Sequence, residues 1–460
     1  MSEPRQAAAL ERLSSQLGSR FTQDAQTLLA VAGDKWFARG EPAAAVFAES
    51  TADVQTVLCE ANAAGIPVTT RGAGYGYVGG CVPVKGGIVL DLSRMNRILE
   101  ISESDFVAVV QPGVITGELQ TAVRERGLFY PPDPASLKNC SLGGNIGTNA
   151  GGPRCLKYGV TRHYVLGLEA VLADGSVVHL GARTHKNKTG FDLIGLLTGS
   201  EGLLGVVTEA TLRLLPLPPA RAALSGGFAD IRTAAAAVEA IFRHGHLPAA
   251  VEVADRFTLQ AARDRLGSER VPAGDAHLLV EIDGQPAGVA AELASLAALV
   301  EEMGATGLQL ADSDASVDSL WLLRREFSES LKATGLVKLN EDVVVPRGRL
   351  VDLIEFARDL QERSGFPIAC FGHAGDGNIH VNIMVGDAEQ PDVRERADAA
   401  LDALFSQILE WSGAITGEHG IGLAKKRWFP QAVDPATRAL HRTIKHAMDP
   451  NGILNPGKFV

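Results

Sequence analysis

The first half of the chain shows short apolar runs separated by glycine-rich turns, a pattern typical of short strands with few helices. Residues 53–64 are predicted to form a helix, because polar Thr51 and Asp53 stand at its start and Gly65 follows it. Asp174-Gly175 lies between two apolar runs and therefore predicts a β-hairpin. The other predicted elements of this half are a helix over 116–126 and strands over 66–70, 87–92, 106–111, 169–173, 176–180 and 205–215.

Three prolines within residues 216–219 interrupt this pattern, because proline disfavours both helix interiors and central strands. After them, alanine-rich helical runs alternate with strands, which predicts a second α+β domain. The predicted elements here are helices over 233–242, 288–303 and 397–411, strands over 277–283, 338–345 and 379–384, and a last helix that ends near Met448.

Length and charge narrow the classes of protein to consider. A chain of 460 residues predicts two or three domains. The net charge of −11, without any block of like charge, is typical of an acidic solvated surface and argues against a nucleic-acid partner. The N-terminus lacks an apolar signal core, and no apolar run approaches the roughly 18 residues that span a bilayer. We therefore expect a soluble cytoplasmic protein that is not integral to a membrane.

Two glycine-flanked segments in the C-terminal third carry imidazoles and carboxylates: His373 and His380 in the first, Glu418 and His419 in the second. The Asp376-Gly377 turn allows His373 to fold back beside His380. Two histidines and one glutamate are a sufficient ligand set for a divalent metal with an open position. His419 would then be left to move a proton. The alternative is a group of unrelated structural histidines.

Three glycine-rich stretches in the first half suit a different kind of ligand. Glycine permits positive φ and close approach, so that consecutive backbone N–H groups can converge on an anion. Residues 72–80 alone are equally compatible with an ordinary loop, since a strand and not a helix follows them. Residues 140–152 are too rich in glycine to build a core and suit backbone pressed against a large flat ligand. Residues 199–208 add a third such stretch before a strand.

Together, residues 71–80, 132–152 and 199–208 resemble the PCMH-type FAD-binding domain of the vanillyl-alcohol oxidase superfamily. The second half resembles the FAD-linked oxidase C-terminal domain, and the whole is similar to D-lactate, glycolate and D-2-hydroxyglutarate dehydrogenases. This resemblance implies an α+β fold, with a two-part FAD-binding domain and a substrate-binding cap domain that has a central antiparallel sheet. The implied limits are 1–217 for the FAD domain, 218–415 for the cap, and 416–460 for a segment that packs back on the FAD domain.

The same resemblance implies how FAD is bound. Residues 72–76 would wrap its pyrophosphate through backbone N–H groups. Tyr75 stands where relatives often have Thr, and residues 71–80 lack the histidine of covalently flavinylated relatives, so we expect dissociable FAD. The implied FAD contacts are Arg71, Gly72, Ala73, Gly74, Tyr75, Gly76, Pro132, Asp133, Ser136, Ser141, Gly144, Asn145, Thr148, Gly151, Gly202, Val207 and Asn455.

A helix with Leu320, Leu323 and Phe327 on its apolar face would present Arg324 and Ser328 one turn apart, so that both can touch one ligand. A single arginine is otherwise most often a surface ion pair. The resemblance implies that the substrate contacts are Arg324, Ser328, Lys338 and Asn382, that His373, His380 and Glu418 bind zinc or manganese, and that His419 is the base. Arg325, Lys425 and Lys426 are left as surface or secondary contacts.

The function that this resemblance implies is FAD-dependent, metal-assisted oxidation of a D-2-hydroxy acid, of the D-lactate or D-2-hydroxyglutarate type, to the 2-keto acid. Five scattered cysteines offer no iron–sulfur ligand set, so electrons would leave to an electron-transfer flavoprotein, a quinone-linked chain or a partner subunit. The alternatives are an alkylglycerone-phosphate synthase-like FAD transferase, the flavin subunit of a glycolate oxidase complex, and a flavin-free metallohydrolase. The sequence leaves the particular hydroxy acid open, and a homodimer is compatible with it.

Overall fold

The computed structural model describes residues 3–460 and divides the chain into two compact units. Unit 1 consists of the chain up to Gly151 together with Val160–Leu217 and Glu418–Val460. Unit 2 consists of Gly152–Gly159 and Pro218–Gly417. No pattern in the sequence predicted that the short segment 152–159 belongs to unit 2. We keep 1–217, 218–415 and 416–460 as a proposal for the domains.

Unit 1 begins with a four-stranded sheet in the order β1-β2-β4-β3, in which β2, β4 and β3 are parallel. Its helix α3 (Thr51–Ala64) confirms the predicted helix: the Ser50 side chain accepts a hydrogen bond from the Asp53 N–H, and Gly65 ends the helix at φ +64°. The other elements are α1 (Glu3–Leu17), η1 (Gly18–Arg20), β1 (Phe21–Thr22), α2 (Ala25–Val31), β2 (Ala44–Phe47), β3 (Val68–Arg71) and β4 (Ile88–Asp91).

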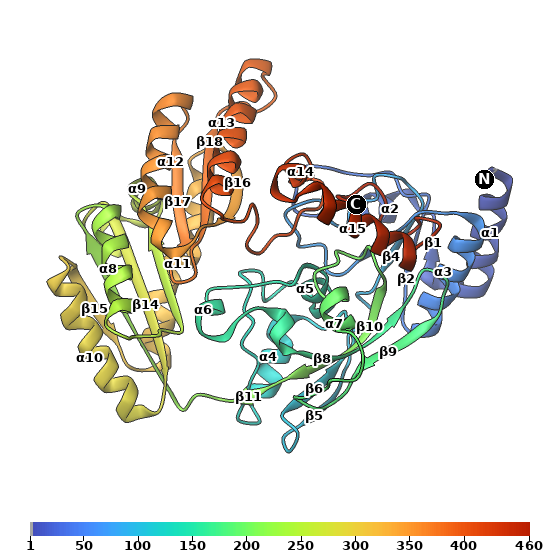
Figure 1. The fold of residues 1–460 in the computed structure, drawn as a ribbon, viewed down its shortest axis with the longest axis horizontal. Coiled ribbons are helices and arrows are strands. Elements are labelled where there is room, and N and C mark those ends of the chain that lie inside the picture. Colours follow the sequence, from blue (N-terminus) through green and yellow to red (C-terminus); the bar gives the residue numbers. More distant parts are fainter. Residues whose placement is uncertain (1–2) are drawn as a thin grey trace. The chain divides into compact units, whose positions relative to one another are not determined.

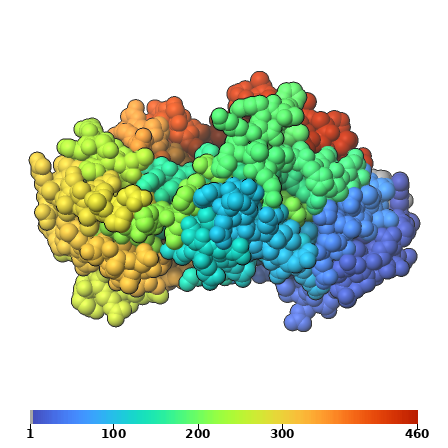
Figure 2. All heavy atoms as spheres, turned by 90° about the horizontal axis from the view of Figure 1, so that it is seen from below, coloured from blue at the N-terminus to red at the C-terminus, as the bar shows by residue number. Residues whose placement is uncertain are grey.

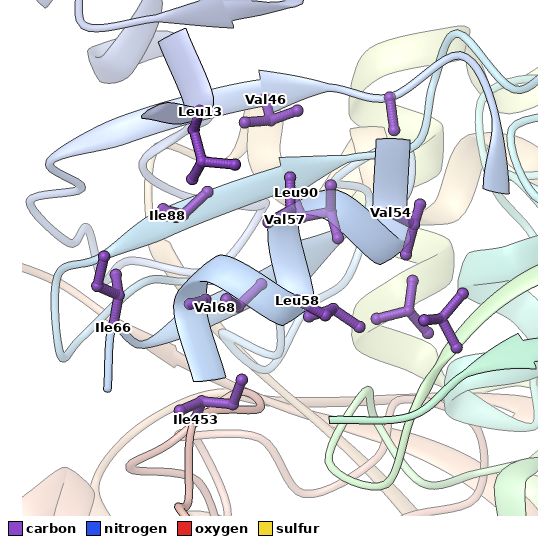
Figure 3. Close-up of a cluster of buried hydrophobic side chains, with 14 of the residues drawn as sticks. Leu13, Val46, Val54, Val57, Leu58, Ile66, Val68, Ile88, Leu90 and Ile453 are labelled. Atoms are coloured by element: carbon purple, nitrogen blue, oxygen red, sulfur yellow. The ribbon is translucent and has the colours of Figure 1, made fainter. Parts of the chain in front are cut away.

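Apolar side chains from α1, α3 and the parallel strands form the core of this sheet, as Figure 3 shows. Leu13, Val57, Leu58 and Leu90 are completely buried there. Ile453, near the end of the chain, joins the same cluster, and its carbonyl accepts a hydrogen bond of 2.7 Å from the Val68 N–H. The last residues of the chain therefore pack against the N-terminal sheet.

A second sheet in unit 1 has five antiparallel strands in the order β5-β6-β10-β8-β9. The β8–β9 pair confirms the hairpin predicted around Asp174-Gly175. The cyan and teal segment that contains α4 lies at the surface in Figure 2. The strands of this sheet are β5 (Ile98–Ser102), β6 (Val107–Val110), β8 (Val165–Val171), β9 (Val177–Gly181) and β10 (Val206–Arg213). The remaining elements of unit 1 are α4 (Thr116–Arg124), β7 (Leu128–Phe129), α5 (Leu142–Thr148), η2 (Thr161–Tyr164), α7 (Leu193–Leu197), β11 (Leu215–Pro216), α14 (Phe429–Ala432) and α15 (Pro435–Met448).

Unit 2 is built on one seven-stranded antiparallel sheet in the order β15-β12-β14-β13-β17-β18-β16 (Figure 1). Two groups of helices cover it: α8, α10, α12 and α13 pack together, and α9 packs with α11. The strands are β12 (Ala220–Phe228), β13 (Ala250–Ala254), β14 (Ala276–Gly284), β15 (Thr306–Ala311), β16 (Val337–Val344), β17 (Ile368–His373) and β18 (Asn378–Val385). The helices are α6 (Cys155–Tyr158), α8 (Ile231–Arg243), α9 (Arg256–Leu266), η3 (Ser268–Arg270), α10 (Pro286–Glu302), α11 (Asp314–Ala333), η4 (Arg347–Arg349), α12 (Leu350–Ser364) and α13 (Pro391–Glu410).

The two faces of this sheet differ in chemistry, because successive side chains of a strand point to opposite faces. On β18, Ile379, Val381 and Ile383 alternate with His380 and Asn382, and all of them are buried. The apolar cluster on the face of α9 and α11 contains Ala254 of β13, Ala369 and Phe371 of β17, and Met384 of β18. The sheet face that packs against α9 and α11 therefore carries both apolar packing residues and the polar residues of the candidate site.

None of the helices within residues 3–460 is both long enough and apolar enough to cross a bilayer.

Candidate active site

The hairpin of β17 and β18 brings two predicted metal ligands together. His373 ends β17 and His380 lies on β18, with their ring centroids 5.6 Å apart and both side chains buried. Gly377 in the connecting turn has φ +84°, and an added Cβ would lie 2.1 Å from the Val345 carbonyl oxygen. Only glycine suits this position, so the turn predicted at Asp376-Gly377 is also what allows the two imidazoles to meet.

Glu418 completes the predicted ligand set. It is the residue directly after Gly417, with which unit 2 ends. One ligand atom each from His373, His380 and Glu418 lie within 4.8 Å of one another. Two imidazoles and one carboxylate suit zinc or manganese and leave positions for a substrate oxygen or water, so the residues present fit the predicted ion.

Asp342 on β16 fixes the backbone just before Glu418. One carboxylate oxygen of Asp342 accepts hydrogen bonds from the Gly417 N–H, at 2.9 Å, and from the Thr416 hydroxyl, at 3.1 Å. Its other oxygen accepts a bond of 2.7 Å from the Asn378 amide. An added Cβ on Gly417 would lie 2.5 Å from that amide nitrogen. The glycine before Glu418 is therefore required by close packing, and sequence analysis missed the role of Asp342.

Glu252 on β13 is a second acid that the sequence analysis missed. It is completely buried and lies 2.6 Å, through Oε1, from Nδ1 of His373. Its Oε2 accepts a hydrogen bond of 2.5 Å from Nε of Arg324. Burial by itself would raise the pKa of Glu252, but the charges and hydrogen bonds of His373 and Arg324 outweigh it and lower the pKa to about 2. The carboxylate is therefore ionised between these two partners.

The predicted substrate contacts Arg324 and Ser328 lie on α11, above the same face of the sheet. The guanidinium of Arg324 stacks over the Phe371 ring, 4.9 Å from its centroid. The Ser328 hydroxyl accepts a hydrogen bond of 2.7 Å from Nζ of Lys338 on β16. Burial, with a smaller effect of the neighbouring cation Lys332, lowers the pKa of Lys338 to about 8. The structure thus brings Arg324, Ser328 and Lys338 together as a cationic group.

Asn382 is completely buried on β18. Its amide nitrogen donates to the carbonyl oxygens of Ala369, at 3.1 Å, and His380, at 3.0 Å. Its Oδ1 has no hydrogen-bond partner within residues 3–460. A buried unsatisfied oxygen is costly, and a donor on a bound ligand would satisfy it. The prediction that Asn382 contacts substrate remains a prediction, and this orphaned oxygen supports it.

His419, the predicted base, stacks on Tyr77 in unit 1 with ring centroids 5.3 Å apart. Buried Glu201 fixes the residues that follow: its carboxylate accepts hydrogen bonds from the N–H groups of Ile421, at 2.7 Å, and Gly422, at 2.8 Å. Burial raises the pKa of Glu201. Glu201 belongs to the third glycine-rich stretch, so the loop of His419 is anchored to a segment that was predicted to bind FAD.

The first and second glycine-rich stretches meet at Ser141. Its hydroxyl oxygen accepts hydrogen bonds from the N–H groups of Ala73, at 3.2 Å, and Gly144, at 3.3 Å. An added Cβ on Gly72 would lie 2.5 Å from that oxygen. The loop over residues 72–76 and the start of α5 are therefore in close backbone contact, as a cofactor cradle made of main chain requires.

Several of the predicted FAD contacts use their side chains within the protein, and Asn455, for example, donates to the carbonyl oxygens of Gly80, at 2.9 Å, and Glu201, at 2.7 Å. Arg71 donates to the Gly33 carbonyl oxygen at 2.6 Å, and Asn145 donates to the Thr116 hydroxyl at 2.6 Å. We therefore expect these residues to offer FAD only main-chain atoms. Of the other predicted FAD contacts, Gly74, Tyr75 and Gly76 lie in the first glycine-rich loop, where Lys35 stands over the Tyr75 ring. Pro132, Asp133 and Ser136 precede α5, Thr148 is its last residue, and Gly151 follows it. Gly202 precedes β10, Val207 lies on it, and Asn455 lies near the end of the chain.

For Lys425 the surface alternative is wrong, and the secondary contact stays a prediction. Lys425, which was left as a surface or secondary contact, is 1% exposed. The chain folds back over it after the His419 loop, and its N–H donates to the Ile421 carbonyl. Lys426 donates from Nζ to the Gly457 carbonyl oxygen at 2.8 Å.

The chain matches the family of FAD linked oxidases, C-terminal domain, over residues 217–459, and the FAD binding domain family over residues 42–181. It therefore belongs to the FAD-linked oxidase family, as the resemblance predicted, and is an FAD-linked oxidoreductase. FAD as cofactor is confirmed at this level, which excludes the flavin-free metallohydrolase.

Three relatives match most of the chain. Glycolate oxidase subunit GlcD of Bacillus subtilis is 37% identical and is covered over 89% of its length by 91% of this chain. D-lactate dehydrogenase of Anaerostipes hadrus is 34% identical, with 92% of this chain and 90% of that protein covered. D-2-hydroxyglutarate dehydrogenase of Stutzerimonas stutzeri is 34% identical, with 95% of each covered.

Solved structures of low identity confirm the predicted α+β fold with a PCMH-type FAD-binding part. A 4-ethylphenol oxidase from Gulosibacter chungangensis gives a TM-score of 0.80 at 23% identity, covering 100% of this chain and 98% of that chain. An alkyldihydroxyacetonephosphate synthase gives 0.77 at 18% identity, covering 100% and 85%. At these identities the likeness shows the fold alone.

Proposed function

We propose that this enzyme oxidises a D-2-hydroxy acid, of the D-lactate or D-2-hydroxyglutarate type, to the 2-keto acid. The observation that carries the proposal is that two imidazoles, His373 and His380, share one face of the unit 2 sheet with a cationic group, Arg324 and Lys338. A 2-hydroxy acid carries a hydroxyl and a carboxylate on adjacent carbons, and these two kinds of group match the two parts of the site. The names of the three relatives support the same substrate class.

Arg324 and Lys338 would bind the substrate carboxylate. A guanidinium can form two parallel hydrogen bonds to a carboxylate, and the lysine adds a point charge. With Nε of Arg324 already engaged by Glu252, its terminal nitrogens form the edge for the substrate. Holding the carboxylate at two points would fix which face of the α-carbon is presented for reaction.

His373, His380 and Glu418 would hold the zinc or manganese ion. The chemistry such an ion supplies when bound is to lower the pKa of a hydroxyl group that contacts it. The chemistry that FAD supplies when bound is to accept a hydride, in this case the hydrogen and electron pair of the α-carbon. His419 would take the hydroxyl proton, so that the hydride and the proton together account for the two hydrogens that the substrate loses.

We further propose that the electrons leave to a separate acceptor, namely an electron-transfer flavoprotein, a quinone-linked chain or a partner subunit, and that the enzyme acts in the cytoplasm. The relative that is named as a subunit, glycolate oxidase subunit GlcD, supports a partner of this kind.

The test is a panel of D- and L-2-hydroxy acids, assayed by dye reduction and by bleaching of the bound flavin with the zinc-loaded or manganese-loaded protein. We expect a D-2-hydroxy acid to bleach the flavin and its L-enantiomer to leave it oxidised. Flavin that stays oxidised with every D-2-hydroxy acid in the panel would contradict the proposal.

The 37% identity of this chain to glycolate oxidase subunit GlcD favours a second candidate function, the flavin subunit of a glycolate oxidase complex. Dye reduction by the isolated chain with glycolate as the best substrate would support this candidate. An alkylglycerone-phosphate synthase-like transferase would, in contrast, leave the flavin without net reduction after turnover.

A further inference from the structure

Two groups with different proposed roles converge on one buried acid. Glu252 contacts the imidazole of His373 through one carboxylate oxygen and the guanidinium of Arg324 through the other, at 2.6 and 2.5 Å. We infer that Glu252 is a positioning residue that sets the cation site and the carboxylate site in one fixed relation. This inference rests on the proposed function, because it assigns Glu252 to that same site.

On the cation side, a carboxylate beside Nδ1 of His373 determines which nitrogen of the ring carries the proton. With Nδ1–H donated to Glu252, the lone pair stands on Nε2, which becomes the ligand atom. Such a partner also limits rotation of the ring and makes it a stronger ligand. Loss of a partner of this kind typically weakens metal binding by about 10–100-fold.

On the carboxylate side, Glu252 holds the guanidinium of Arg324 by its Nε edge while Phe371 supports its flat face. These two contacts leave little freedom in the plane or the direction of the terminal nitrogens. A glutamine at position 252 could not replace the acid, because one of its two polar atoms is an N–H donor and both partners present donors. At least one of His373 and Arg324 would therefore lose its fixed orientation.

The same face of the sheet offers a matched control. Glu281 on β14 is 1% exposed, and its carboxylate accepts hydrogen bonds from Arg154, at 3.0 Å, and Trp321, at 2.5 Å. Like Glu252, it is a buried acid between two donors. Unlike Glu252, it has no hydrogen bond to His373 or Arg324 among the contacts that the structure describes. A merely structural role for buried acids on this face would therefore affect both variants alike.

The experiment titrates the FAD-loaded, metal-stripped protein with zinc by calorimetry, for wild type, Glu252→Gln and Glu281→Gln. We expect Glu252→Gln to bind zinc roughly 10–100-fold more weakly, and Glu281→Gln to stay within about 2-fold of wild type. At saturating zinc, we expect the KM of Glu252→Gln for the best D-2-hydroxy acid to stay several-fold raised, since Arg324 is still misplaced.

Equal zinc affinity and KM in Glu252→Gln and wild type would overturn the inference and leave the proposed function intact. An equal loss in Glu281→Gln would also overturn it, because the effect would then be general to the sheet. Wild type that binds neither zinc nor manganese and yet oxidises hydroxy acids would instead refute the metal in the proposed function. If Glu252→Gln does not fold, Glu252→Asp takes its place, because it keeps the charge but shortens the side chain. A zinc affinity of Glu252→Asp equal to that of wild type would overturn the inference. A zinc affinity between that of wild type and the roughly 10–100-fold loss would support it.

Discussion

The two units build their candidate binding surfaces in opposite ways. Unit 1 relies on main chain: Gly72, Ala73 and Gly144 crowd around Ser141 so closely that an added Cβ on Gly72 would clash. Unit 2 relies on side chains that strand register places on one face, such as His380 and Lys338. A backbone surface is sensitive to any added side-chain atom, whereas a side-chain surface is sensitive to the loss of particular functional groups.

The largest effect should come from deleting a functional group in unit 2. We expect His380→Ala to lower the rate of flavin reduction by at least roughly 1,000-fold, since a catalytic metal contributes several kcal/mol to the reaction. FAD content should stay at the wild-type level, because the glycine-rich loops belong to unit 1. Stopped-flow absorbance and the flavin-to-protein ratio measure the two quantities.

Chelation gives the same test without a mutation. EDTA should abolish activity, and zinc or manganese should restore it. Full activity of rigorously metal-free enzyme would show that the side chains of unit 2 have another purpose, and the comparison between the units would then fail.

His419, like Glu418, is a residue of unit 1 whose side chain is proposed to take part in the chemistry. We expect His419→Ala to retain FAD and to reduce flavin at least about 100-fold more slowly, the low end for loss of a general base. Flavin reduction at the wild-type rate would refute that role. The Tyr77→Phe variant, which keeps the ring that stacks on His419, serves as a control and should reduce flavin at close to the normal rate.

Adding one methyl group to a glycine of unit 1 should affect FAD binding and leave zinc binding unchanged. Gly72→Ala places a Cβ 2.5 Å from the Ser141 oxygen, and overpacking of this kind costs about 1–3 kcal/mol, so FAD should bind roughly 10–100-fold more weakly. Gly80→Ala is the matched control, since an added Cβ there meets nothing within 4 Å among the described residues. Both variants should bind zinc as wild type does.

Fluorescence of released FAD during dilution would measure these affinities. Equal FAD binding in Gly72→Ala and Gly80→Ala would show that close main-chain approach is not what the first glycine-rich stretch provides.

The smallest effect concerns pH. Burial lowers the pKa of Lys338 to about 8, so its charged form, which would bind the substrate carboxylate, is lost as pH rises through that value. We expect kcat/KM to fall several-fold above pH 8 in wild type. Lys338→Arg keeps its charge and should remove this alkaline decline; an unchanged pH profile in that variant would exclude Lys338 as its cause.

Local sequence patterns determined much of the fold. Glycine, proline and capping residues predicted α3, the β8–β9 hairpin and the interruption near residue 217, because those signals act within a few residues. The predicted helix over 233–242 is confirmed within α8, and that over 397–411 is confirmed as the greater part of α13. The histidine hairpin could be predicted for the same reason, since only six residues lie between its two histidines.

Only the tertiary structure showed the partners of several buried charged residues. Glu252 stands alone in an apolar strand, and its partners lie 121 and 72 residues away, so nothing near it in sequence marks it. Glu201 reaches Ile421 across 220 residues, and the same return of the chain buries Lys425, which was expected to be a surface or secondary contact. A buried charge is stable only beside partners that folding brings to it, and therefore its role cannot be predicted from its own segment.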